Sequence, residues 1–171
     1  MKTLPESWKI QLHQHLSRKN NRLGLPRTCL VGIGSDLRGD DSAGLLVARG
    51  LLHLQSNNLL IIDGGPAPEN FSSKIKKFNP DLVIFIDAAH MDEPPGTIKW
   101  IPLESIDGMS ASTHSLPLSI LANFLFAELG CDVTVLGIQP AQNEIGSNPS
   151  VSVQAAVEGI LTELKKVFSP A

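Results

Sequence analysis

The sequence predicts an α/β fold, a mainly parallel, twisted five-stranded sheet with helices on both faces, in three α/β/α layers. Two observations predict it. Short apolar segments alternate with amphipathic helical segments along the chain, and the short segments are apolar at nearly every position, as strands buried on both faces are. We expect strands at residues 28–34, 59–63, 81–87, 96–101 and 132–138.

The helices expected between these strands follow from apolar residues at helical spacing. They span residues 42–54, 70–78, 115–129 and 150–168, and Pro117 fits the first turn of the third. Another amphipathic helix is expected at residues 5–18, followed by a polar stretch. We therefore divide the chain into an N-terminal helix and linker, residues 1–27, and one domain, residues 28–171, a size typical of single domains.

Composition excludes several classes of function. The net charge is −3, and no basic stripe could follow a phosphate backbone, so we expect no nucleic-acid partner. No apolar run reaches the roughly 18 residues that a membrane span needs. Cys29 and Cys131 lie in apolar strand segments without metal-ligand spacing, which predicts buried, reduced thiols and a cytoplasmic location.

Ligands of open parallel sheets bind beyond the carboxyl ends of the strands. The polar residues that the predicted elements place near this edge are Ser35, Asp36, Arg38, Asp40, Asp41, Asp63, Asp87 and His114. Gly32 and Gly34 are not a dinucleotide fingerprint, because its third glycine would fall at Leu37. We expect these glycines to form a tight turn with its backbone close to a ligand.

Asp41, Asp87 and His114 are the candidate metal ligands. Two carboxylates and an imidazole suit a borderline divalent ion, and three protein ligands leave positions open for water or substrate. Structural alternatives remain at each position. Asp40 or Asp41 could cap the helix that begins near Ser42, Asp87 could accept loop hydrogen bonds, and His114 could be an ordinary helix-start residue. An aspartic dyad of Asp41 and Asp87 is a weaker alternative, because the flanking residues of that class are absent.

Five segments, in order, resemble the signatures of the nickel–iron hydrogenase maturation endopeptidases. They are residues 32–44 (GIGSDLRGDDSAG), 63–70 (DGGPAPEN), 86–88 (IDA), 112–118 (STHSLPL) and 136–140 (LGIQP). The second and fourth segments resemble the branch that processes hydrogenases of the formate-hydrogenlyase type.

The resemblance implies an endopeptidase that removes the C-terminal extension of a hydrogenase large-subunit precursor after nickel insertion. It implies that Asp41, Asp87 and His114 recognise nickel that the substrate delivers, and another divalent cation could take that place in vitro. Ser35 departs from the family, which usually has asparagine there; serine keeps a donor and an acceptor but is shorter.

Two other functions share these features. One is a non-catalytic chaperone that checks the metal of a metalloenzyme precursor, and it would use the same three ligands. The other is a small-molecule hydrolase or phosphorylase, which would need a set of basic residues that the sequence does not offer. The oligomeric state and the contacts of the N-terminal helix stay open at this stage.

Overall fold

The computed structural model describes residues 6–18, 24–107 and 116–170. Its centre is one five-stranded sheet in the order β2-β1-β3-β5-β4. The strands β1, β2, β3 and β5 are parallel, and β4 pairs with β5 in the antiparallel direction. The bounds are β1 Thr28–Gly32, β2 Leu59–Asp63, β3 Leu82–Ala88, β4 Ile98–Pro102 and β5 Asp132–Ile138. The predicted fold class is confirmed.

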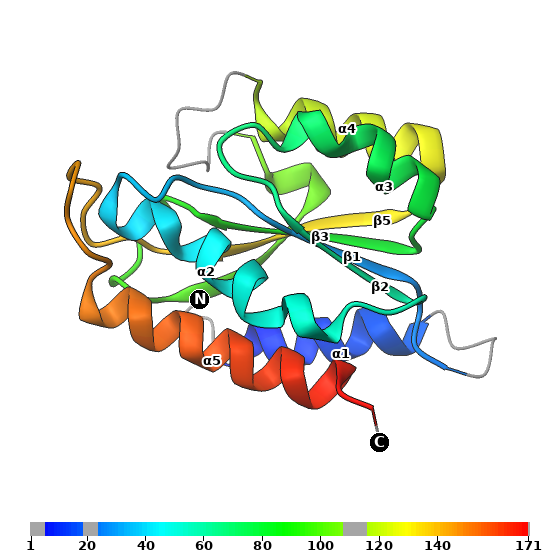
Figure 1. Cartoon of the computed structure of the whole chain (residues 1–171), viewed down its shortest axis with the longest axis horizontal. Coiled ribbons are helices and arrows are strands. Elements are labelled where there is room, and N and C mark those ends of the chain that lie inside the picture. The colour runs from blue at the N-terminus through cyan, green and yellow to red at the C-terminus, as the bar shows by residue number, and fades with distance from the viewer. Residues whose placement is uncertain (1–5, 19–23, 108–115, 171) are drawn as a thin grey trace.

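Helices cover both faces of the sheet (Figure 1). On one face lie α1 (Ser7–Arg18), α2 (Ala43–Leu51) and α5 (Val151–Phe168), which share an apolar core with Leu30, Ile84 and Leu136. On the other face lie α3 (Ser72–Phe78) and α4 (Leu118–Leu129), packed against Val31, Phe85 and other strand residues. The central strands β1 and β3 are buried along their whole length, which explains why they lack an alternating pattern.

The N-terminal helix α1 packs on the domain itself. Trp8, Leu12 and Leu16 recur every four residues, and all three are buried in the core shared with α2 and α5. The helix also contacts β4, where the rings of His15 and Trp100 have centroids 4.8 Å apart. The sequence left open what this helix contacts, and the structure shows that it packs on its own domain.

The helix starts differ in detail from the sequence-based expectation. Short 3-10 turns, η1 (Gly39–Ser42) and η3 (Pro68–Phe71), precede α2 and α3, and another, η2 (Leu52–Leu54), extends α2. Pro117 was expected in the first turn of α4 but is its N-cap, with an extended ψ of 133°. At the start of α5 the N-cap is Ser150, whose hydroxyl accepts a hydrogen bond from the backbone N–H of Val153.

Both cysteines are buried, as predicted, and neither is in a disulfide. Burial raises the pKa of the Cys29 thiol to about 12, because the thiolate would lose its hydration. Among the residues that the structure describes, no helix combines the length and the apolar character needed to cross a bilayer.

Candidate functional site

The two candidate acids lie at the carboxyl edge of the central strands. Asp87 is the second-last residue of β3 and is 1% exposed, and Asp41 belongs to η1 and is 4% exposed. The turn η1 contacts β3, so the structure brings these two residues to the same region. His114 lies outside the described residues, and its predicted place beside them stays a prediction.

Gly44 shows how closely the start of α2 approaches the strand ends. A Cβ atom at this position would lie 2.1 Å from the Ile86 carbonyl oxygen and 2.3 Å from that of Ile33. Such distances are far below van der Waals contact, so only glycine allows the helix to approach this closely. The close approach places η1, and with it Asp41, against the end of β3.

The main chain around Asp41 is fixed by a compact turn. The Asp41 N–H donates to the Arg38 carbonyl oxygen at 2.8 Å, and the Asp41 carbonyl oxygen accepts from the Ser35 N–H at 3.2 Å. Gly34 has a φ of +143°, and a Cβ there would lie 1.7 Å from the Asp41 carbonyl oxygen. The sequence predicted a tight turn at Gly32 and Gly34. In the structure Gly34 makes a close approach to the backbone of Asp41.

Asp40 has a different role from its neighbour. Its side chain is fully buried and accepts hydrogen bonds from segments that follow β5. The Oδ2 atom accepts from the N–H groups of Ala141 and Gln142 at 2.7 and 3.0 Å and from the Ser150 hydroxyl at 2.9 Å, and Oδ1 accepts from the Ser150 N–H at 2.6 Å. The possibility that Asp40 caps the adjacent helix is therefore wrong. Asp40 binds Ser150, the N-cap of α5, and the N-terminus of α2 has no side-chain cap hydrogen bond.

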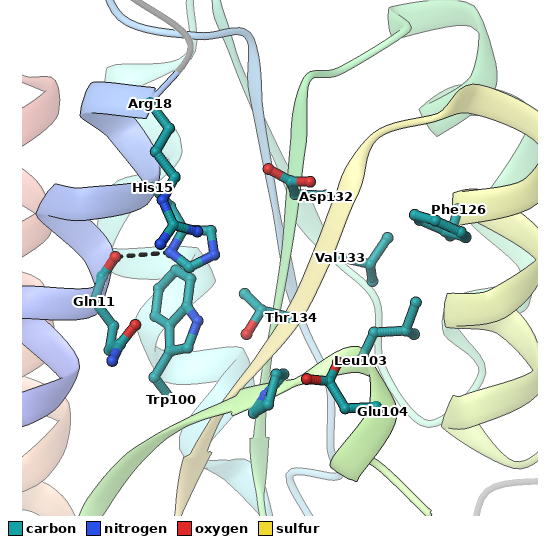
Figure 2. A pocket seen from close by; sticks show the side chains of 11 residues that line it. Gln11, His15, Arg18, Trp100, Leu103, Glu104, Phe126, Asp132, Val133 and Thr134 are labelled. Carbon is teal, nitrogen blue, oxygen red and sulfur yellow. Dashed lines mark hydrogen bonds between the residues drawn. The ribbon is translucent and has the colours of Figure 1, made fainter.

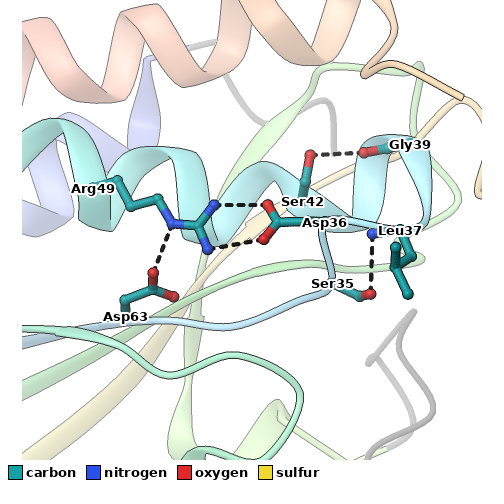
Figure 3. Close-up of polar contacts among 7 residues, drawn as sticks. All are labelled: Ser35, Asp36, Leu37, Gly39, Ser42, Arg49 and Asp63. Carbon is teal, nitrogen blue, oxygen red and sulfur yellow. Dashed lines mark hydrogen bonds and ion pairs between the residues drawn. The ribbon is translucent and has the colours of Figure 1, made fainter. Parts of the chain in front are cut away.

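Arg49 of α2 connects the segment that follows β1 with Asp63, the last residue of β2 (Figure 3). Its guanidinium binds both carboxylate oxygens of Asp36, at 2.7 and 2.9 Å, and its Nε donates to Asp63 at 2.6 Å. The hydrogen bonds from Arg49 hold the pKa of Asp36 below its usual value, and the two carboxylates raise the pKa of Arg49. The ion pairs tie this polar rim of the site to α2.

Ser35 stands where the resembling family usually has asparagine. Its hydroxyl oxygen accepts a hydrogen bond from the Leu37 N–H at 3.2 Å, within the turn that leads to Asp41 (Figure 3). Such a bond from a residue to the N–H two positions later is a local turn that serine and asparagine can both form. The serine can therefore preserve the turn.

Gln139 and Arg49 are two positioning residues that sequence reasoning missed. The buried Gln139 side chain accepts from the Met91 N–H at 2.7 Å and donates to the Pro140 carbonyl at 3.3 Å, so it fixes the segment that follows β3. Gln139 was visible only as part of the LGIQP segment, and Arg49 only as a polar residue of the helix. The signal that could have indicated Arg49 is its positive charge between two acids along the chain, Asp36 and Asp63.

One cavity of the described structure lies elsewhere. It has a volume of about 450 Å³, and Figure 2 shows its lining, which includes His15, Trp100 and Asp132. Asp132 and Thr134 are at the beginning of β5, whereas Asp87 pairs with Gly137 near the end of that strand. The cavity is therefore at the amino edge of the parallel strands, the edge that does not usually bind ligands in such sheets.

The described donors fit part of a metal site. Asp41 and Asp87 are buried acids of two elements in contact, η1 and β3, and carboxylate oxygens are ligands that suit a divalent cation. Within residues 6–18, 24–107 and 116–170, no group of three or more His, Cys, Asp and Glu side chains is placed to hold a metal ion. A site with three ligands would therefore need a residue such as His114.

Comparisons with known proteins agree with this architecture. Residues 49–167 match the family model described as hydrogenase maturation protease. The Hydrogenase 3 maturation protease of Escherichia coli K12 is 38% identical over 112 residues, which are 65% of this chain and 71% of that protein.

Two solved structures extend the similarity to most of the fold. The crystal structure of the hydrogenase maturation protease HycI from Thermococcus kodakarensis has a TM-score of 0.81 and 33% identity, covering 94% of this chain and 99% of that one. The solution structure of the endopeptidase HycI from Escherichia coli has a TM-score of 0.72 and 32% identity, covering 81% and 90%. On the family match and these identities, the chain belongs to the hydrogenase maturation protease family.

Proposed function

We propose that this protein is an endopeptidase that removes the C-terminal extension of a nickel–iron hydrogenase large-subunit precursor after nickel has been inserted. The observation that carries the proposal is the pair of buried carboxylates, Asp41 and Asp87, at the carboxyl edge of the sheet in a member of this protease family. The two buried cysteines, which are not in disulfides, support a reducing, cytoplasmic location.

Nickel belongs to the substrate in this proposal. The precursor presents the ion on its own thiolates, and Asp41, Asp87 and His114 complete its coordination. Binding then depends on metal loading, because only a precursor that carries the cation can offset the negative charge of the two buried carboxylates. Cleavage of the tail is thereby restricted to precursor that already holds its metal.

The chain's own residues orient the scissile region. The turn held by Gly34 and Arg38 fixes the main chain of Asp41, and β3 fixes that of Asp87. A bound divalent ion supplies Lewis-acid chemistry, polarising a carbonyl or lowering the pKa of water. One of the carboxylates is also a candidate general base for the attacking water.

The test uses purified precursor with and without nickel and follows tail removal by mass spectrometry. We expect only the nickel-loaded precursor to be shortened, and we expect His114→Ala and Asp87→Asn to abolish cleavage with native circular dichroism spectra. Asp36→Asn, which changes an exposed acid of the same edge, is the matched control. Equal cleavage of nickel-free precursor would contradict metal recognition, and a precursor that is bound but never shortened would indicate a chaperone instead.

A further inference from the structure

Among the residues that the structure describes, three large apolar side chains are far more exposed than the others. Val151 is 83% exposed, Ile145 is 74% exposed and Leu37 is 71% exposed, whereas the next large apolar residue among those described, Ile10, is 54% exposed. Single exposed apolar residues are common and need no explanation. What requires an explanation here is that the three come from segments joined around one short turn.

That turn is η1, which carries Asp40 and Asp41. The Leu37 carbonyl oxygen accepts from the Gly146 N–H at 2.9 Å, so the segment before η1 adjoins the segment that bears Ile145. Asp40 of η1 binds the N–H and hydroxyl of Ser150, the residue before Val151. We call Leu37, Ile145 and Val151 the η1 rim, since each lies within one residue of a hydrogen bond to η1 or to the segment leading into it.

The segment between β5 and α5 is held in shape by its own polar contacts. The Gln142 side chain donates to the Asn148 carbonyl at 2.9 Å and accepts from the Ser147 hydroxyl at 2.8 Å. The Ser147 hydroxyl also lies 2.7 Å from the Glu144 carbonyl oxygen, and Gly146 adopts a φ of +81° that favours glycine. The loop therefore presents Ile145 outward in a preformed conformation, which lowers the entropy lost when a partner binds it.

We infer that the η1 rim is a docking surface for the protein substrate, contacting apolar residues of the precursor beside the segment that is cut. The inference rests on the proposed function. An endopeptidase must hold the surface of its protein substrate against the region around its catalytic groups, and the rim adjoins the turn that bears Asp41. Exposed apolar side chains on a rigid support are typical anchors of such contacts.

The test compares two triple variants. The rim variant combines Leu37→Ser, Ile145→Ser and Val151→Ser, and the control variant combines Ile10→Ser, Ile120→Ser and Phe124→Ser, which are exposed apolar residues of α1 and α4. All six side chains are exposed, so both variants should keep the thermal midpoint of the wild type within a few degrees. Cleavage of the nickel-loaded precursor gives kcat and KM, and immobilised precursor gives the affinity.

We expect the rim variant to raise KM and weaken precursor binding by at least about fivefold with kcat nearly unchanged, as loss of uniform binding does. The control variant should match the wild type. Unchanged KM and affinity in the rim variant, or an equal loss in the control, would overturn the inference.

Two further outcomes separate this inference from others. If the wild type binds the precursor through the rim but does not cut it, the proposed function fails while the docking surface stands. If sedimentation shows that the wild type alone forms a dimer that the rim variant cannot form, the rim joins two copies of this chain and the inference is overturned.

Discussion

Replacing Asp40 by alanine should reveal how strongly one buried carboxylate holds the segment between β5 and α5. The side chain accepts four hydrogen bonds, three from backbone N–H groups and one from the Ser150 hydroxyl. A hydrogen bond to a charged group is worth about 1.5–3 kcal/mol. Water can replace the carboxylate at Ala141 and Gln142, which are not buried, so the bonds do not add in full. We expect a loss of about 3–5 kcal/mol in the free energy of unfolding.

The assay is thermal and urea unfolding followed by circular dichroism. At about 2–4 °C per kcal/mol for a chain of this size, the thermal midpoint should fall by about 6–20 °C. Hydrogen exchange should accelerate at the Ala141, Gln142 and Ser150 amides in particular. Asp40→Asn keeps one acceptor oxygen and should lose less than the alanine variant, while Asp36→Asn, an exposed acid nearby, should lose less than about 1 kcal/mol. An Asp40→Ala variant within about 1 kcal/mol of the wild type would refute the assignment of Asp40 as a structural clamp.

Two further substitutions probe the same edge of the sheet. Gly34→Ala should lower the free energy of unfolding in urea by at least about 3 kcal/mol, because the new Cβ would overlap the Asp41 carbonyl oxygen. Gly65→Ala, at a φ of +58° but with open space around it, should lower it by only about 1 kcal/mol, and equal losses in the two variants would contradict the close approach at Gly34. Arg49→Met should lower stability by about 1 kcal/mol at neutral pH, where Asp36 is ionised. Because Arg49 holds the pKa of Asp36 below its usual value, the stability difference between wild type and variant should persist at neutral pH and disappear as acid protonates Asp36 below about pH 4. Urea midpoints that show a constant difference across that range would exclude the Arg49–Asp36 ion pair as the cause.

The sheet could be predicted from the sequence because burial on both faces leaves a direct trace in composition. The segments around Val31, Phe85 and Val135 are apolar at successive positions, and their strand bounds were predicted within two residues. The start of α4 was not, because the extended backbone of Pro117 is compatible with both the N-cap and the first turn until neighbouring residues decide.

The candidate site was predictable only where position along a strand implies position in space. Asp41 and Asp87 follow this rule, since strand ends of a parallel sheet meet at one edge. The partners of Asp40 lie 101 to 110 residues further along the chain, and no local pattern records such contacts. For the same reason the roles of the adjacent acids Asp40 and Asp41 could not be distinguished before the fold was known. Asp40 binds the N-cap of α5, whereas Asp41 lies in the turn that contacts β3.

The helix α1 has a consequence for how this protein can be produced. Trp8, Leu12 and Leu16 fill the interior, so the leading segment is an integral part of the globule even though the recognisable motifs begin after it. A recombinant version that starts at the first glycine motif would expose apolar surface of α5 and β4 that α1 normally covers. Exposed apolar areas of this kind promote aggregation. Purification tags are therefore best placed ahead of residue 6 and never as a replacement for the helix.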